Sequence, residues 1–421
     1  MKKVYYFFFI VLGFQQLSAQ LYLEKQTRHR FAQLNVGFDI QTSVGGETFF
    51  INPQGQSQQL SLGSTTKPRI LIGGTHFWGH ADIYLAIPLT GPTFQSQEQD
   101  IVYSSGVETV FKYYPWKIQH NRIRPFIGIS IAPFYYEQDN NNTRFSEGPE
   151  LNHTSLPLYT GLTFNAKQHL FEVGLMYNYA HEVVYYLDRL SPAKIETPPF
   201  YLNFSYRYLI DTTIGAEKGW ESGKTQAITD KLATKGALNN FFLAIGMSSA
   251  FWLGNSSYNE VNRPYLEKYS TSLMPDLGFG YYFHNPDVNI GASYRGYSSR
   301  TEAYGTEQIP KRRSFVFEVT KMLGDYHGFV PFIGPAVSYE RLSFQEAFEG
   351  NLTQDITEKK LSYGITFGWD IRPDRLQFFI LRTNLRWFPS LYLDLENDQR
   401  ISFNNLEFNF IQLILYPERI F

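Results

Sequence analysis

Polar and apolar residues alternate along most of this chain, in about sixteen segments between Phe31 and Phe421. In the first segment the apolar members are Leu34, Val36, Phe38 and Ile40. A β-strand directs successive side chains to opposite faces, so each such segment predicts a strand with one apolar and one polar face. Helical periodicity is almost missing, which predicts an all-β fold.

Each segment runs to roughly ten residues, the length that a tilted strand needs to cross the hydrocarbon of a membrane. Short connections are expected at Trp78–His80, Pro115–Asn121, Asn165–His169, His284–Asp287 and Arg372–Arg375. Long polar connections are expected at Gly45–Lys67, Gly91–Asp100, Glu137–Ser155, Tyr185–Pro199, Gly254–Ser272, Ser299–Arg313, Gln345–Lys360 and Pro389–Ile401. Short and long connections therefore alternate, as in outer-membrane barrels with short periplasmic turns and long extracellular loops. The pattern predicts a transmembrane antiparallel β-barrel with both termini in the periplasm. A soluble β-sandwich is the alternative.

Residues 1–19 have the composition of a secretion signal. Lys2 and Lys3 precede the apolar run Val4–Phe14, and Ala19 is a small residue suited to cleavage before Gln20. An N-terminal membrane anchor is the alternative, but eleven apolar residues are too few to span a bilayer as a helix. Export and alternation together predict an outer-membrane location.

Two short motifs recur in the same order, about 200 residues apart. Pro125–Gly128 returns as Pro331–Gly334, and Gly161–Phe164 returns as Gly364–Phe367. We interpret the chain as two eight-strand repeats, at residues 20–210 and 241–421.

The connection 211–240 is the one long segment on the periplasmic side. Ile228 and Leu232 lie four residues apart within Thr225–Ala237, which predicts a short amphipathic helix in a solvated linker. A partner-binding helix or a lumen plug is the alternative. Since a hairpin needs only a few residues, the spacer favours two tandem eight-stranded barrels over one sixteen-stranded barrel.

The alternation directs charged side chains into the lumen of each repeat. In the first repeat these are Asp39, Asp82, Glu108, Lys112, Glu172 and Arg207. In the second repeat they are Asp276, Arg295, Glu318, Asp370, Arg382 and Arg386. An eight-stranded interior is just wide enough for side chains to fill, and lone buried charges are costly. We therefore expect a packed ion-pair network; a charged constriction in a water-filled pore is the alternative.

Catalytic and metal-binding signals are weak. Cysteine is absent, which removes disulfides, thiolate metal sites and a Cys nucleophile. The nine histidines have no metal-ligand spacing, and the net charge of −2 gives no footprint for nucleic acid. His181 and Glu182, with Asp188 nearby, resemble a rim-mounted acid/base site, although an ordinary polar rim is the simpler interpretation. We expect no enzyme activity, no cofactor, no metal and no nucleic-acid partner.

Several segments resemble a known family. Phe111–Trp116 followed by Arg124–Gly128 resembles the middle hairpin of the small eight-stranded outer-membrane barrels, and Phe204–Tyr208 resembles their closing strand. Phe421 resembles their C-terminal aromatic residue, and Ser18-Ala19-Gln20 resembles signal ends common among Bacteroidota, which are Gram-negative. The resemblance implies a tandem duplication of such a barrel and transfers no functional residue. As a departure from the family pattern, Pro417–Arg419 predicts that the final strand ends near Tyr416.

The leading functional hypothesis is a non-enzymatic structural or scaffolding barrel, an accessory subunit of an envelope complex. Such a protein contacts outer-membrane lipid and uses its extracellular loops or the 211–240 linker to hold protein partners. The alternative is a passive, porin-like pore for small polar solutes. Because eight-stranded lumens are filled and sixteen-stranded lumens leave an aqueous channel, the number of barrels and the function are linked predictions.

Overall fold

The structure is a computed structural model that describes residues 30–51, 56–89, 91–92, 94–96, 101–138, 150–211, 230–253, 256–324, 329–371, 379–389, 391–395 and 398–419. The predicted signal, most of the 211–240 connection and Phe421 lie outside the described residues.

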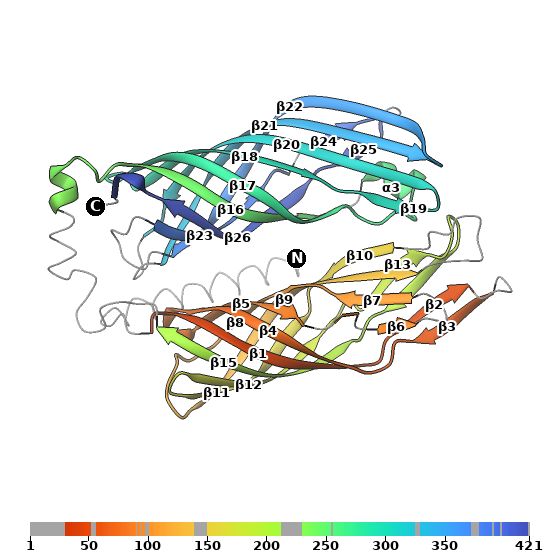
Figure 1. Ribbon diagram of the computed structural model, residues 1–421, viewed down its shortest axis with the longest axis horizontal. Helices are drawn as coiled ribbons and strands as arrows, with labels where there is room; N and C mark the ends of the chain where they lie inside the picture. Colours follow the sequence, from red (N-terminus) through yellow and green to blue (C-terminus); the bar gives the residue numbers. More distant parts are fainter. Residues whose placement is uncertain are drawn as a thin grey trace, which may run out of the picture.

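The described strands form two closed barrels of eight antiparallel strands each, which lie side by side in Figure 1. The first barrel contains β1 (Ala32–Val44), β4 (Thr65–His76), β5 (Ala81–Pro88), β8 (Glu108–Tyr113), β9 (Ile123–Gln138), β11 (Leu158–Ala166), β12 (His169–Tyr177) and β15 (Phe200–Asp211). The second contains β16 (Asn240–Trp252), β17 (Ser270–Phe283), β18 (Val288–Ser298), β20 (Thr306–Met322), β21 (Phe329–Phe348), β22 (Asn351–Ile371), β23 (Phe379–Trp387) and β26 (Asn405–Leu415). The first strand of each barrel pairs with its last, β1 with β15 and β16 with β26. The prediction of two eight-stranded barrels is therefore confirmed over one of sixteen strands.

Both barrels are inverted relative to a soluble sandwich, with apolar side chains outside and charges inside. Along β12 every residue from His169 to Tyr177 alternates between exposed and buried. Phe38 is 55% exposed on the outer face of β1, whereas the neighbouring Asp39 is 1% exposed inside. An exterior band of this kind is stable only against lipid, since in water it would expose the apolar face of nearly every strand.

The recurring glycines occupy equivalent positions in the two barrels. Gly128 and Gly334 lie in the fifth strand of each, and a Cβ at either would fall within 2.4 Å of a carbonyl oxygen on the fourth strand. Gly161 and Gly364 lie in the sixth strand of each, and a Cβ would lie 2.3 Å from a carbonyl oxygen on the seventh. Close strand contact at these four positions explains why both repeats need glycine there. The tandem duplication itself stays a prediction.

The long connections, which outer-membrane barrels place on the extracellular side, contain further secondary structure. Those above the first barrel hold β2 (Glu47–Ile51), β3 (Ser57–Ser61), β6 (Phe94–Ser96), β7 (Ile101–Ser105), β10 (Glu150–Ser155), β13 (Glu182–Tyr186) and β14 (Pro192–Glu196). Those above the second hold α3 (Ser257–Asn262), β19 (Thr301–Ala303), β24 (Tyr392–Asp394) and β25 (Arg400–Ser402).

Two of the predicted long loops, 299–313 and 345–360, are wrong. β20 begins at Thr306, and β21 and β22 form one long hairpin through a tight turn at Glu349 and Gly350, whose φ angles are 48° and 77°. Beyond the membrane the outer face of a strand contacts water, so its outward residues are polar. The apolar alternation that identifies a membrane strand is lost there.

Short helical segments flank the second barrel. Residues 230–234 are helical, inside the span where a short helix was expected, and Leu232 in this helix is fully buried. β26 ends at Leu415, and η3 (Pro417–Arg419) follows it as a 3-10 turn. No helix among the described residues is long and apolar enough to cross a membrane.

The two barrels contact each other at both ends. On the periplasmic side the ring of Phe77, in η1 (Phe77–Gly79), packs 4.6 Å from the ring of Phe329. On the extracellular side the guanidinium of Arg189 donates to the Tyr304 carbonyl, and the Tyr304 hydroxyl donates to the Tyr186 carbonyl at 2.6 Å. We use the name clasp for the extracellular contacts alone, which are made by Arg189, Tyr304 and Tyr186 and by the pair described next, Asn152 and Glu267.

The remaining pair of the clasp is Asn152, whose backbone N–H donates to the carboxylate of Glu267. Partial burial, followed by the nearby charge of Glu150, raises the pKa of Glu267 to about 7, although the hydrogen bond from Asn152 acts in the opposite direction. The clasp therefore contains a carboxyl group that titrates near neutral pH, outside the membrane-spanning strands.

Candidate functional site

The middle of the first lumen is filled by a chain of ion pairs. Arg207 on β15 lies between Asp82 on β5 and Glu172 on β12, with N–O distances of 2.7 and 3.2 Å. Lys112 on β8 reaches the other oxygen of Glu172. All four side chains are fully excluded from solvent. The Lys112 ammonium also lies 4.6 Å from the centroid of the Tyr84 ring, so its remaining surroundings are aromatic.

A second cluster lies nearer the extracellular mouth. Arg69 on β4 contacts Asp39 on β1, at 2.5 Å, and Glu108 on β8. Lys67, two residues earlier on the same inward face, donates to the Ser105 hydroxyl. Lys67 and Arg69 both point into the lumen from β4, so in this layer two cations lie near the carboxylates of Asp39 and Glu108.

Arg124 occupies the periplasmic end of the same lumen. Its guanidinium donates to the backbone carbonyls of Gly79 and Trp116, each at 3.0 Å, and to the Asn165 amide oxygen at 3.1 Å. It also lies 4.4 Å from the centroid of the Tyr114 ring. These hydrogen bonds connect the periplasmic turns to one another, and the Arg124 side chain fills this end of the lumen.

The second lumen has the same construction with different residues. Arg386 on β23 bridges Asp276 on β17, at 2.7 Å, and Glu318 on β20, at 3.0 Å. Arg382, four residues earlier on the inward face of β23, pairs with Asp370 at 2.7 Å.

Nearer the mouth of the second lumen the chain of charges continues. Arg312 contacts Glu340 and Glu407, both at 2.6 Å. Glu407 also contacts Arg295. Both of these carboxylates therefore face a guanidinium, and the four strands β18, β20, β21 and β26 are joined through them.

An apolar cluster caps each charge network on the extracellular side. Above the first barrel the buried members are Leu62, Ile101, Tyr103, Phe134, Tyr136, Leu151, Tyr185, Leu187 and Ile195. Above the second they are Tyr258, Tyr269, Val316, Ala336, Leu342, Phe344, Phe388, Leu391, Leu393, Ile401 and Phe403. In the second barrel the segment 388–403 supplies Phe388, Leu391, Leu393, Ile401 and Phe403, each fully buried. Val316 and Ala336 belong to the barrel strands β20 and β21, and most other members of the caps come from extracellular segments folded over the barrel mouths.

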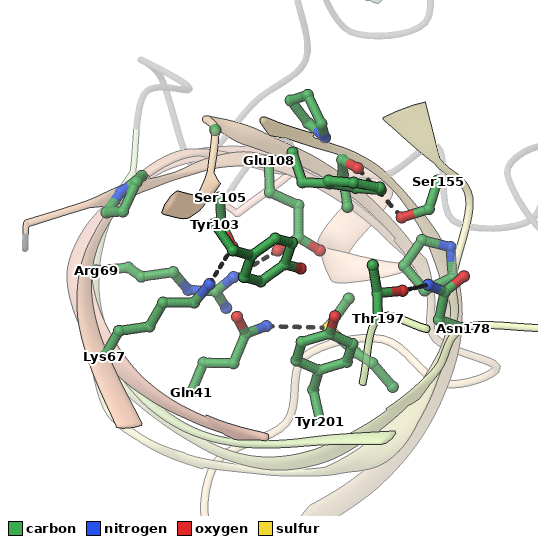
Figure 2. A pocket seen from close by; sticks show the side chains of 17 residues that line it. Gln41, Lys67, Arg69, Tyr103, Ser105, Glu108, Ser155, Asn178, Thr197 and Tyr201 are labelled. Carbon is green, nitrogen blue, oxygen red and sulfur yellow. Dashed lines mark hydrogen bonds and ion pairs between the residues drawn. The ribbon is translucent and has the colours of Figure 1, made fainter. Parts of the chain in front are cut away.

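Figure 2 shows the space that remains between the cap and the charges of the first barrel. Gln41, Lys67 and Arg69 project into it from the barrel wall. Tyr103 and Phe134 of the cap line the same space. Its volume is about 30 Å³, room for one or two water molecules. This volume is far below what a small-molecule ligand requires.

The twelve lumen charges expected from the sequence all point inward, and each lies in an ion pair. They are Asp39, Asp82, Glu108, Lys112, Glu172, Arg207, Asp276, Arg295, Glu318, Asp370, Arg382 and Arg386. Sequence reasoning missed Lys67, Arg69, Arg124, Arg312, Glu340 and Glu407, which complete the networks. Arg69 could have been predicted from the sequence, because it lies an even number of residues from Leu71 and Thr75, whose side chains point inward on β4.

The rim residues His181, Glu182 and Asp188 do not form a common site. The His181 ring contacts the Asn178 carbonyl at 3.2 Å, and Glu182 pairs with Lys194 at 2.7 Å. Hydrogen bonds from the Leu190 and Ser191 backbone hold the pKa of Asp188 below its usual value, against a raising effect of partial burial. Among the described residues, no group of three or more His, Asp or Glu side chains is arranged to hold a metal ion.

No family model and no curated protein matches the chain. Solved structures similar to it include Neisserial surface protein A, at 15% identity over 42% of this chain and 97% of that one, with a TM-score of 0.28. Ail, the attachment invasion locus protein of Yersinia pestis, is similar at 12% identity over 42% and 96%, with a TM-score of 0.24. A Pseudomonas aeruginosa FadL homologue is similar at 11% identity over 94% and 91%, with a TM-score of 0.20.

The class of the protein follows from its own geometry. Closed antiparallel barrels satisfy every backbone hydrogen bond between strands, and the apolar band outside these two barrels is of the kind that contacts lipid. The chain is an integral β-barrel protein of the Gram-negative outer membrane.

Proposed function

We propose that this protein is a non-conducting, non-enzymatic barrel with a structural or scaffolding role, an accessory subunit of an envelope complex. The observation that supports this most is the occupation of both lumens, by ion pairs through the membrane and by apolar clusters at the mouths. A solute would have to separate fully buried pairs such as Arg207–Asp82 in order to pass. Removing one partner of such a pair costs about 3–5 kcal/mol, and several pairs lie in series.

The extracellular strands supply the surface for a partner. β2, β3, β13 and β14 form a separate four-stranded sheet above the first barrel, and the β21–β22 hairpin projects beyond the second. Packing on the apolar caps fixes these strands in place, which lowers the entropy cost of binding. The 211–240 linker is the proposed contact on the periplasmic side.

Conductance in a planar bilayer tests the non-conducting part of the proposal. The purified wild-type protein is expected to give no discrete steps, under conditions in which a sixteen-stranded porin conducts. Discrete steps from the wild-type protein would instead establish the passive pore for small polar solutes.

A steric insertion tests the scaffolding part. A small soluble domain inserted after Gly350, at the exposed tip of the β21–β22 turn, leaves the barrels intact because loop tips tolerate insertions. In mild detergent the wild-type protein is expected to migrate in a larger complex, and the insertion is expected to release it. Migration of the wild-type protein as a lone chain in fresh membrane extracts contradicts the scaffolding role.

A further inference from the structure

Three cations lie side by side on the outer face of the second barrel. Arg313 on β20 is opposite Arg341 on β21, and Arg341 is opposite Lys359 on β22. All three side chains are exposed. We call them the cationic row. Lys311 lies one step further from the membrane on the same face of β20.

The cationic row lies at the edge of the membrane. The next outward row toward the periplasm contains Tyr294, Phe315, Tyr339 and Leu361, each at least 50% exposed. On β21 the outward residues from Pro331 to Tyr339 are all apolar, and this stretch runs nine residues, the length that a tilted strand uses to cross the hydrocarbon. This row, of which Tyr294, Phe315 and Tyr339 are aromatic, is therefore the girdle of the outer leaflet, and the cations begin where the lipid headgroups begin.

No described residue neutralises the cationic row. None of the three cations forms an ion pair within the described residues, and Asp355, an acidic residue on the same face, contacts Gln345 instead. Asp355 is four residues along β22 from Lys359, a distance of about 13 Å at the rise of a strand. Like charges directly opposite in a sheet destabilise it, so this arrangement is favourable only with an external anion.

We infer that the cationic row binds the phosphate groups of an anionic glycolipid of the outer leaflet. Guanidinium groups bind phosphate through paired hydrogen bonds, and a lysine adds a point charge. The acyl chains of the same molecule lie against Phe315, Tyr339 and Leu361 directly below. This amphipathic match favours a lipid headgroup over a free phosphate ion, which would gain only the charge.

Binding of bisphosphorylated lipid A tests this inference. The wild-type protein in detergent is titrated with lipid A, and bound molecules are counted by native mass spectrometry. The triple variant Arg313→Gln/Arg341→Gln/Lys359→Gln is expected to bind lipid A at least about tenfold more weakly, since several charged hydrogen bonds are lost. Arg300→Gln is the matched control, because Arg300 is an exposed extracellular cation already paired with Glu302 and Glu307.

Two further ligands distinguish the source of the phosphate. Dephosphorylated lipid A is expected to bind the wild-type protein and the triple variant equally weakly, and inorganic phosphate at millimolar concentration is expected not to displace lipid A. Displacement by inorganic phosphate would show a free-anion site and overturn the inference. Equal lipid A binding by the wild-type protein and the triple variant would overturn it as well.

The single variant Arg341→Glu separates lipid binding from a structural role. It places a carboxylate between Arg313 and Lys359, so resistance to thermal unfolding in lipid-free detergent is expected to rise while lipid A binding falls. A fall in both would mean that Arg341 supports the fold, and would contradict the inference.

Discussion

Removal of Arg207 is the sharpest perturbation of the first lumen. The guanidinium faces Asp82 and Glu172 at 2.7 and 3.2 Å, and all three side chains are excluded from solvent. In Arg207→Ala the Asp82 carboxylate loses its ion-pair partner inside a filled barrel, while Glu172 keeps Lys112. Breaking a buried pair in this way costs about 3–5 kcal/mol. We expect the free energy of unfolding to fall by that amount.

The measurement is urea unfolding of the refolded protein in phospholipid vesicles, followed by tryptophan fluorescence and by the heat-dependent mobility of the barrel. Lys194→Ala is the matched control, because Lys194 forms an ion pair with Glu182 that is half exposed on both sides, and its loss is expected to leave the midpoint unchanged. The double variant Arg207→Gln/Asp82→Asn is expected to recover most of the loss, since it removes the pair without leaving an unpaired carboxylate.

The outcome that refutes this reasoning is a change below about 1 kcal/mol for Arg207→Ala, the size expected when water solvates the remaining charges. A small change accompanied by a shift in ion selectivity would place Arg207 in an aqueous channel. A large loss that the double variant fails to recover would mean that the packing of the Arg207 stem, and not its charge, stabilises the lumen.

Three other perturbations have defined outcomes. In the clasp, the pKa of Glu267 is raised to about 7, so between about pH 4.5 and pH 7 the folded chain binds a proton that the unfolded chain releases. The stabilisation that protonated Glu267 gives to the folded protein is full below about pH 4.5 and is lost as the pH rises to about 7. Glu267→Gln is therefore expected to flatten the stability profile across this window and to stabilise the protein above it, in unfolding midpoints measured from pH 4 to 8. Gly334→Val should cost about 1–3 kcal/mol in the same assay, because a Cβ there lies 1.8 Å from the Val319 carbonyl oxygen, whereas Gly91→Ala, with open space around it, should be neutral. Phe388→Ala, at a fully buried position of the second cap, should lower the free energy of unfolding by about 3–5 kcal/mol. It should still give no conductance in a planar bilayer, because the ion pairs below the cap remain.

Alternation alone predicted the parts of the fold that lie within the membrane. A strand between lipid and a filled lumen must place apolar residues outward and polar residues inward, so parity assigns Asp39 and Arg386 to the interior without any knowledge of partners. The same constraint is weaker beyond the membrane, where β22 continues through Gln354 and Glu358 with polar residues on both faces. Sequence reasoning ended the strands too early there and placed Arg312 in a loop.

The ion-pair partner of each inward charge could not be predicted from the alternation of polar and apolar residues. Arg312 and Glu407 are 95 residues apart in sequence and meet only because β20 and β26 lie on different walls of one closed barrel. The strand register decides which layer each inward side chain joins, and the register depends on turns and bulges whose geometry the composition does not encode. The apolar caps were missed for a related reason, since Leu391 and Leu393 fall within Pro389–Ile401, which was predicted as a polar loop and not as a segment that turns back over the mouth.

Closure by β1 and β15 links the fold to the function. Twelve consecutive residues of β1, from Gln33 to Val44, pair with β15, which leaves β15 no free edge for β16. If β15 paired with β16 instead, the same inward charges would line one wide barrel, and a sixteen-stranded lumen is too wide for side chains to fill. Lys112 and Glu172 meet because their strands lie on opposite walls of a narrow interior, and in a wide one water would separate them. The choice of partner by a single strand therefore decides whether these residues form a filled core or a channel, and the observed pairing supports the proposal of a non-conducting barrel.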